Sequence, residues 1–284
     1  MPVMTVIDTF IVMDRLQAAG FSLETATSLL GQLKGMAGAF INLPQVFTIA
    51  LAASLVPAIS ESITRNDFGG AARKSELAIR LSLIIGLPAA FGLFILSDPI
   101  MKLMYPAEPA TLGMVLRYLS MAVIFLTLVQ TMTGILQGMG KERIPVVNMV
   151  IGALVKLVVS YTLTSIPFIN IRGAAIGTVA GYGVSAILNL SAIIKHQRSG
   201  MRVSKIVMKP AIATVAMMAA AYFSYSLFFG ALERNSVATL LSVAIAALVY
   251  VVVLILIKGI AIEELEMAPG GKRLSKILKK KGLL

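Results

Sequence analysis

Long runs of apolar residues, separated by short polar connections, constrain this chain more than any other feature. A helix needs about 20 consecutive, mainly apolar residues to cross the hydrocarbon core of a bilayer. Charged residues make up only 13% of the 284 residues, whereas an average soluble domain contains about 25%. Transmembrane β-barrels show short segments of alternating polarity instead, and the sequence lacks them. We therefore expect an all-α, polytopic membrane protein.

The apolar runs predict about eight transmembrane helices. We expect them at Pro2–Leu16, Leu29–Ile59, Leu77–Leu96, Leu112–Leu136, Pro145–Ile166, Ile171–Ile194, Ile206–Phe229 and Val237–Ile257. The first six contain charged residues, whereas the last two contain none beyond Lys209, which belongs to the basic connection before them. This division predicts six helices around a polar interior in residues 1–196, two accessory helices in 197–258 and a basic tail in 259–284.

The basic residues are distributed unevenly between alternate connections. Eighteen of the 25 Lys and Arg residues lie in Ser60–Arg80, Met139–Ile144, Lys195–Lys209 and the C-terminal tail. The opposite connections contain only Lys102, Arg172 and Arg234. Cytoplasmic loops carry the excess of Lys and Arg in membrane proteins, so we expect a cytoplasmic C-terminus. This arrangement also favours membrane lipids, and no nucleic acid, as partners of the basic residues.

The residue types exclude several kinds of chemistry. The chain has no cysteine and one histidine, His196, so we expect no metal site and no cysteine nucleophile. No Ser/His/Asp set and no phosphate-binding glycine loop with its lysine is present. We therefore expect no catalytic residues, no cofactor and no enzymatic activity.

Lys156 is the sharpest single signal, because it lies in the middle of a predicted span, too deep to reach the interface easily. Asn148, Gly152, Ser160 and Thr164 accompany it at intervals of four residues, on one face of the helix. We expect Lys156 to contact an anionic substrate in a cavity. The alternative is an internal ion pair with Asp8 or Asp14.

Asp8 and Arg15 are seven residues apart in the first predicted span and would share a helix face. We expect both to face a polar cavity, with Arg15 binding substrate. Asp8 and the neighbouring Asp14 would couple an ion or serve the structure. The alternative places Arg15 at the outer surface and gives Asp8 a purely structural role.

Three further residues of the second predicted span are candidates for substrate binding. Lys34 lies near the outer end of the span, where a lysine also reaches the interface easily. Asn42 and Gln45 flank Pro44, which frees a backbone carbonyl and bends the helix. These two side chains would either bind a ligand or form hydrogen bonds with the backbone groups that the bend frees.

Several motifs resemble those of a known group of membrane proteins. They are Asn42-Leu-Pro-Gln, Ala50-Leu-Ala-Ala-Ser-Leu-Val-Pro-Ala-Ile-Ser, Gly86-Leu-Pro-Ala-Ala-Phe-Gly-Leu, Gly134-Ile-Leu-Gln-Gly-Met-Gly-Lys and Gly173-Ala-Ala-Ile-Gly-Thr. In order and spacing they resemble the polysaccharide exporters of the stage V sporulation protein B type. That group belongs to the multidrug/oligosaccharidyl-lipid/polysaccharide (MOP) exporter superfamily, which also contains the MurJ-type lipid II flippases.

The resemblance implies that residues 1–196 are the C-terminal lobe of a two-lobed transporter and 197–258 its two extra helices. It implies alternating access, in which a lipid-linked saccharide on an undecaprenyl diphosphate carrier crosses the bacterial cell membrane during envelope synthesis. Arg15, Lys156 and Lys34 would hold the diphosphate. The N-terminal lobe would be missing, or supplied by a partner chain.

Two alternative functions follow from the same residues. A multidrug or cation antiporter of the same superfamily would have mainly acidic residues in its cavity, whereas here basic residues at least equal them. A non-transporting membrane subunit of an envelope-synthesis complex would suit a single lobe, but it leaves Lys156 without a function.

Overall fold

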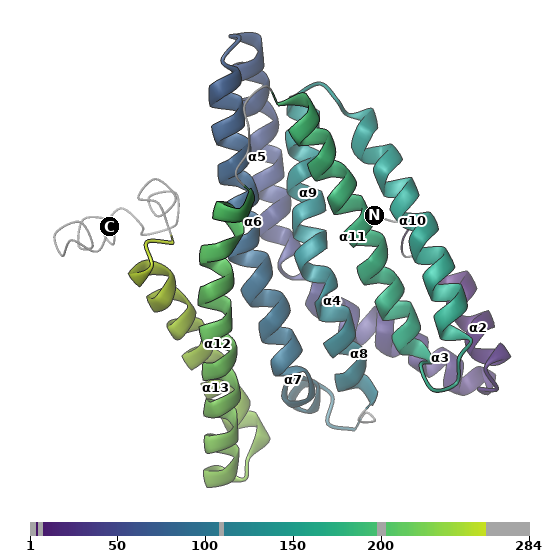
Figure 1. Ribbon diagram of the computed structural model, residues 1–284. Helices are drawn as coiled ribbons and strands as arrows, with labels where there is room; N and C mark the ends of the chain where they lie inside the picture. The colour runs from purple at the N-terminus through teal and green to yellow at the C-terminus, as the bar shows by residue number, and fades with distance from the viewer. Residues whose placement is uncertain (1–3, 5–7, 108–110, 198–202, 260–284) are drawn as a thin grey trace. The chain divides into compact units, whose positions relative to one another are not determined.

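The computed structural model describes residue 4 and residues 8–107, 111–197 and 203–259, in which helices and turns occur and no strand (Figure 1). The all-α membrane fold is therefore confirmed. The chain divides into two compact units, Met1–Met201 and Arg202–Leu284.

Most helices belong to the first unit. They are η1 (Asp8–Val12), α2 (Met13–Ala18), α3 (Leu23–Gly31), η2 (Gln32–Ala37), α4 (Gly38–Asn42), α5 (Gln45–Thr64), α6 (Phe68–Ile95), α7 (Ser97–Met104), α8 (Thr111–Ser120), α9 (Ala122–Gly138), α10 (Arg143–Thr164) and α11 (Ile171–His196). The labels η1 and η2 mark π-helices, in which each turn is wider than in an α-helix. The second unit contains α12 (Val203–Leu232) and α13 (Asn235–Leu256).

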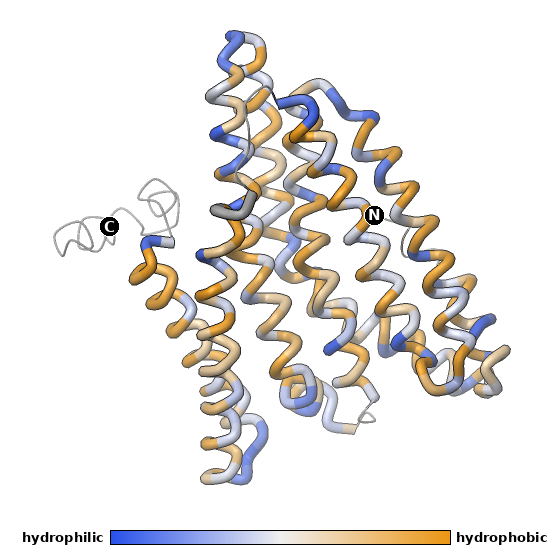
Figure 2. Tube along the Cα trace, viewed as in Figure 1, coloured by the Kyte–Doolittle hydropathy of each residue, from blue (hydrophilic) through white to orange (hydrophobic). Residues whose placement is uncertain are grey.

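In the described residues, seven helical segments are long and apolar enough to cross a membrane. They are Gln45–Thr64, Phe68–Ile95, Thr111–Gly138, Arg143–Thr164, Ile171–His196, Ile206–Leu232 and Asn235–Leu256. Each overlaps a predicted span. Figure 2 shows apolar residues along the length of these helices, with polar residues gathered toward the helix ends of the first unit. The first predicted span corresponds to η1 and α2, and residues 1–3 and 5–7 of it lie outside the described residues.

The predicted span Leu29–Ile59, which we expected to bend at Pro44, is not one continuous helix. The chain forms α3, η2, α4 and α5 here, and the helix is interrupted at Leu43 and Pro44. Pro44 has no N–H to donate within a helix, and its ring crowds the preceding turn. The interruption separates α5, which is long enough to span the membrane, from the helical segment that α3, η2 and α4 form without a break.

Small residues bring α10 and α11 into close contact. A Cβ added at Gly152 on α10 would collide with the Ser185 hydroxyl and the Gly181 carbonyl of α11. A Cβ at Gly181 would lie 2.8 Å from the Gly152 carbonyl and 2.8 Å from Lys156 Cβ. Small residues let membrane helices approach through their backbones. The same contact fixes where Lys156 enters the bundle.

The basic connections of the first unit gather at one end. The turn between α5 and α6, the turn between α9 and α10, and the C-terminal end of α11 lie together at the top of Figure 1. These segments contain Arg65, Lys141, Arg143 and Lys195, whereas Lys102 in α7 and Arg172 in α11 belong to the opposite end. The orientation of this basic end toward the cytoplasm stays a prediction.

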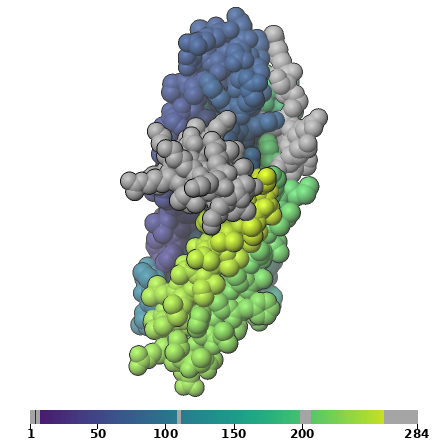
Figure 3. All heavy atoms as spheres, turned by 90° about the vertical axis from the view of Figure 1, so that its left-hand side faces the viewer, coloured from purple at the N-terminus to yellow at the C-terminus, as the bar shows by residue number. Residues whose placement is uncertain are grey.

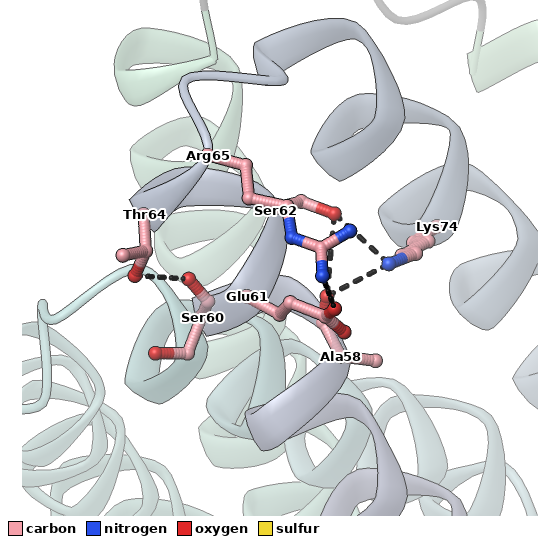
Figure 4. A network of polar contacts seen from close by, with 7 residues as sticks. All are labelled: Ala58, Ser60, Glu61, Ser62, Thr64, Arg65 and Lys74. Carbon is pink, nitrogen blue, oxygen red and sulfur yellow. Dashed lines mark hydrogen bonds and ion pairs between the residues drawn. The ribbon is translucent and has the colours of Figure 1, made fainter.

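Two of these basic side chains stabilise the turn between α5 and α6 (Figure 4). Lys74 Nζ donates to the Ala58 carbonyl at 2.9 Å and to Ser62 Oγ at 2.9 Å. Arg65 Nη2 lies 2.8 Å from Glu61 Oε1, one helical turn earlier. Their charges are therefore committed to local contacts.

The second unit is a helical hairpin. In this unit α12 and α13 lie side by side along their lengths (Figures 1 and 3). Tyr225 donates its hydroxyl to Asn235 Oδ1 at 2.9 Å, and Lys209 Nζ donates to the Lys258 carbonyl at 2.7 Å. The predicted basic tail, 259–284, lies outside the described residues except for Gly259, and the division at 196/197 stays a prediction.

Candidate functional site

A cavity of about 140 Å³ lies inside the first unit, where seven helices meet. Its walls come from η1, η2, α4, α8, α9, α10 and α11. Four predicted site residues line it: Asp8, Lys34, Asn42 and Lys156. The remaining lining residues are Met4, Leu33, Gly38, Ile41, Leu119, Leu126, Thr178 and Tyr182. With two ammonium groups and one carboxylate, positive charge exceeds negative charge in the cavity wall.

Lys156 and Asp8 form an ion pair in this wall. Lys156 Nζ lies 2.7 Å from Asp8 Oδ2 and donates to the Met4 carbonyl at 2.6 Å. The two side chains are only 1% and 9% exposed. The internal ion pair considered as an alternative for Lys156 is thus formed in this structure, with Asp8 and not Asp14. The ion pair explains how the Lys156 ammonium group can be buried within a span, since an unpaired charge there would cost much free energy.

Buried polar atoms without hydrogen bonds occur in this pair and farther along α10. Among the described residues, Asp8 Oδ1, Ser160 Oγ and Thr164 Oγ1 are buried and have no hydrogen-bond partner. Each such group costs about 1–3 kcal/mol relative to a satisfied one. The ion pair is therefore not fully surrounded by complementary groups, and Asp8 retains capacity to accept a further donor.

Asp8 and Lys34 both lie on π-helical segments. Asp8 is the first residue of η1, and Lys34 lies within η2. Lys34 is partly exposed, and its Nζ donates to Thr9 Oγ1 of η1 at 2.6 Å. π-Helical turns occur often at functional sites. Here they present two opposite charges to one cavity from neighbouring helices.

Asn42 and Gln45 lie on either side of the interruption at Pro44. Gln45 Nε2 donates to Asn42 Oδ1 at 2.8 Å, which bridges the end of α4 to the start of α5. Gln130 on α9 continues the chain of amides by donating to Gln45 Oε1 at 3.3 Å. Thr48 donates to Gln130 Oε1. Asn42 lines the cavity, whereas Gln45 does not. The Gln45 side chain instead connects the interruption at Pro44 to α9 through its hydrogen bonds with Asn42 and Gln130.

Arg15 and Asp14 lie outside the cavity. Arg15 Nη2 contacts Asp14 Oδ2 at 2.5 Å, and the guanidinium lies over the Tyr161 ring, 4.2 Å from its centroid. We expected Arg15 to share a helix face with Asp8, but Asp8 begins the π-helix η1, and Arg15 lies beyond it in α2. A π-helical turn contains more residues than an α-helical one, so side chains beyond it face in a new direction.

Gln130, Thr178 and Tyr182 were missed at the sequence level. Gln130 had a usable signal, because it is the one amide inside the apolar stretch Ala122–Leu136. Thr178 and Tyr182 are four residues apart and therefore share a face of α11. That spacing alone does not distinguish a cavity wall from an ordinary helix contact.

The arrangement suits binding more than covalent chemistry. The described residues include no cluster of His, Cys, Asp and Glu that would hold a metal ion. The charged groups of the cavity are ammonium and carboxylate, and they are already paired or hydrogen-bonded. Such a cavity favours an anionic ligand that competes with Asp8 for the ammonium groups.

Known proteins resemble this chain in sequence. The family model described as "Lipid II flippase MurJ" matches residues 37–241. Stage V sporulation protein B of Bacillus subtilis is 26% identical over 262 residues, covering 92% of this chain and 50% of that protein. The lipid II flippase MurJ of the same organism is 28% identical over 159 residues, covering 55% of this chain and 29% of that protein.

A solved structure shares the fold. The lipid II flippase MurJ in an inward closed conformation superposes with a TM-score of 0.69 at 17% identity. The match covers 88% of this chain and 50% of that one. The chain thus spans about half the length of the first relatives that it matches.

Proposed function

The chain belongs to the family of the lipid II flippase MurJ, and from this premise we propose that it moves a lipid-linked saccharide precursor across the bacterial inner membrane. No covalent bond changes in such a step. The protein binds the precursor at one face of the membrane and releases it at the other by alternating access. The substrate would be a saccharide on an undecaprenyl diphosphate carrier, used in peptidoglycan or polysaccharide synthesis.

The observation that supports this proposal is the excess of positive charge in the central cavity. Lys34 and Lys156 both line this cavity, and Asp8 is the one acidic residue among its lining residues. Contacts between ammonium groups and phosphate oxygens are short and stronger than neutral hydrogen bonds. Lys34 would meet the diphosphate first, because it is partly exposed and Lys156 is not.

Lys156 would bind the diphosphate by exchanging its contact with Asp8 for a contact with phosphate. Its ammonium group now contacts Asp8, so phosphate oxygens would take the place of Asp8 Oδ2. The displaced carboxylate would then accept a cation, which gives Asp8 its role in ion coupling. Asn42 would donate to the same phosphate group from the end of α4. Asp14 and Arg15 pair with each other and serve the structure at the end of α2.

The proposal includes a second lobe. The chain spans about half the length of the first relatives it matches, and alternating access needs two bodies that move against each other. A second six-helix lobe, in the same polypeptide or in a partner chain, would supply the other wall. The basic end and the C-terminus would face the cytoplasm.

One observation favours a second candidate. The buried contact of Lys156 with Asp8 is the arrangement that a purely structural ion pair would adopt. A non-transporting membrane subunit of an envelope-synthesis complex would keep this pair permanently closed. The two candidates differ in whether an anionic lipid separates Lys156 from Asp8.

Transfer of a fluorescent lipid-linked saccharide between the leaflets of proteoliposomes tests the proposal. The chain is reconstituted together with the N-terminal lobe of a full-length relative. We expect transfer to fall at least 10-fold in Lys34→Ala and to be preserved in Lys102→Ala, since Lys102 is an exposed residue of α7. Equal transfer by both variants would reject the cavity as the binding site. Absence of transfer, with intact binding to other envelope enzymes, would favour the structural subunit.

A further inference from the structure

A second cavity, of about 330 Å³, lies at the basic end of the first unit. Ile63 of α5 and Phe68 and Ala71 of α6 form one side. The turn between α9 and α10 and the end of α11 form the other side, with Met139, Lys141, His196 and Gln197. The lining residues are separate from those of the central cavity. The proposed transport does not require this second cavity.

We propose that this cavity binds the phosphate headgroup of an anionic membrane phospholipid. The site lies where α5, α6, α9, α10 and α11 end, which is where spanning helices meet the headgroup region. Basic pockets between membrane helices on the cytoplasmic side are suited to anionic headgroups. The assignment depends on the lining residues and not on the central cavity.

Lys141 supplies the charge. It is exposed, and its ammonium group makes no hydrogen bond or ion pair with any residue that the structure describes. The neighbouring basic residues differ, because Lys74 donates to Ala58 and Ser62 and Arg65 pairs with Glu61 (Figure 4). An anion at this end would therefore find Lys141 ready to donate.

Gln197 is the second observation that points to a ligand. Its side-chain Nε2 and Oε1 are both buried, and neither has a hydrogen-bond partner among the described residues. Leaving such groups unsatisfied is costly. A headgroup in the cavity would give Nε2 a phosphate oxygen to donate to and Oε1 a glycerol hydroxyl to accept from.

His196 adds a third polar contact. Its Nδ1 lies 2.8 Å from the Ala192 carbonyl, which orients the ring and leaves Nε2 for a ligand. The opposite wall is apolar, with Ile63, Phe68 and Ala71. A ligand with an anionic head and an apolar stem matches both walls, whereas inorganic phosphate matches only one. We therefore assign the site to a lipid of the phosphatidylglycerol type.

Native mass spectrometry of the intact chain, released from nanodiscs, tests the assignment. Nanodiscs of mixed phosphatidylglycerol and phosphatidylcholine are compared with nanodiscs of phosphatidylcholine alone. We expect phosphatidylglycerol to remain bound and phosphatidylcholine to dissociate. Lys141→Ala should weaken retention roughly 10-fold or more, since it removes a charge-assisted contact. Arg143→Ala is the matched control, because Arg143 is exposed and basic but does not line the cavity.

Gln197→Leu provides a second, independent variant. It removes both unsatisfied polar atoms and keeps the side chain's bulk, so the chain should fold as before and retain less phosphatidylglycerol. Equal losses in Lys141→Ala and Arg143→Ala would overturn the proposal in favour of diffuse attraction to the basic end. Unchanged retention in Gln197→Leu, or thermal stabilisation by inorganic phosphate equal to that by the lipid, would overturn it as well.

Discussion

Lys156 Nζ and Asp8 Oδ2 lie 2.7 Å apart inside the bundle, although 148 residues separate them in the chain. The contact ties η1 to α10 in the wall of the central cavity. It is both a buried ion pair that links two helices and the group of charges that an anionic ligand would have to rearrange. The structural role of the ion pair predicts effects on stability, whereas its role in ligand binding predicts effects on transport.

The first prediction concerns stability. Lys156→Met should lower the free energy of unfolding by about 3–5 kcal/mol, because it leaves the buried Asp8 carboxylate unpaired. The double variant Asp8→Leu/Lys156→Met should recover most of that loss, since apolar replacements of buried ion pairs are often neutral. Thermal or denaturant unfolding in mild detergent measures both. Lys102→Met is the exposed control, and additive losses in the double variant would contradict the pairing.

The second prediction concerns transport by Lys156 variants. Lys156→Ala should abolish leaflet transfer of a labelled lipid-linked saccharide in a full-length, two-lobed context while expression stays intact. The stabilised double variant Asp8→Leu/Lys156→Met should be inactive as well, which separates loss of function from loss of folding. Normal transfer by either variant would show that the ion pair is only structural.

The third prediction concerns Lys34, which is partly exposed and hydrogen-bonded to Thr9. Lys34→Ala should cost about 1 kcal/mol of stability, the scale of one hydrogen bond. Transfer should nevertheless fall at least 10-fold, which corresponds to about 1.4 kcal/mol of lost binding to the diphosphate. Lys34→Arg should retain most of the activity, because a guanidinium also pairs with phosphate. Equal activity of Lys34→Ala and the unmodified protein would remove Lys34 from the site.

The fourth prediction concerns the contact between α10 and α11. Gly181→Ala should destabilise the chain by about 1–3 kcal/mol, the usual cost of inserting a group into a packed interface. The new methyl group would press on the Gly152 carbonyl and on Lys156 Cβ, each 2.8 Å away. Gly230→Ala on α12 is the control, because its Cβ would meet nothing within 4 Å. Equal melting temperatures for the two variants would argue against the close approach.

The fifth prediction concerns topology. A reporter fused after Leu284 should give a cytoplasmic signal, and one inserted between α10 and α11 should give an external signal. The basis is the concentration of Lys and Arg at one end of the first unit and in the C-terminal part of the chain. An external signal after Leu284 would contradict the predicted cytoplasmic orientation of the basic end and of the C-terminus.

The sequence predicts the fold well, because the bilayer imposes a simple length requirement on every span. The seven segments that meet it overlap predicted runs. The interruption at Pro44 was less visible, because a proline can either bend a membrane helix or divide it. Here the hydrogen bond between the Gln45 and Asn42 side chains connects the end of α4 to the start of α5. Such tertiary contacts have no signature in local periodicity.

The candidate site was predictable in its chemistry and less so in its geometry. Lys156 and Asp8 could be recognised because charges are rare within spans. The choice between Asp8 and Asp14 as its partner depended on helix facing, and η1 changes the facing within the first helix. The same π-helical segment separates Arg15 from the cavity. The contact of Gln130 with Gln45 could be predicted only by knowing which face of α9 packs against α5.

The long sequence separation of Lys156 and Asp8 also affects how the protein is made. Ribosomes synthesise about 5–20 residues per second, so Asp8 leaves the ribosome roughly 7 to 30 s before Lys156 does. Throughout that interval Asp8 lacks the lysine with which it forms its ion pair in the folded chain. The ion pair can therefore form only after Lys156 of α10 has been synthesised, and it joins an earlier-made and a later-made part of the cavity wall.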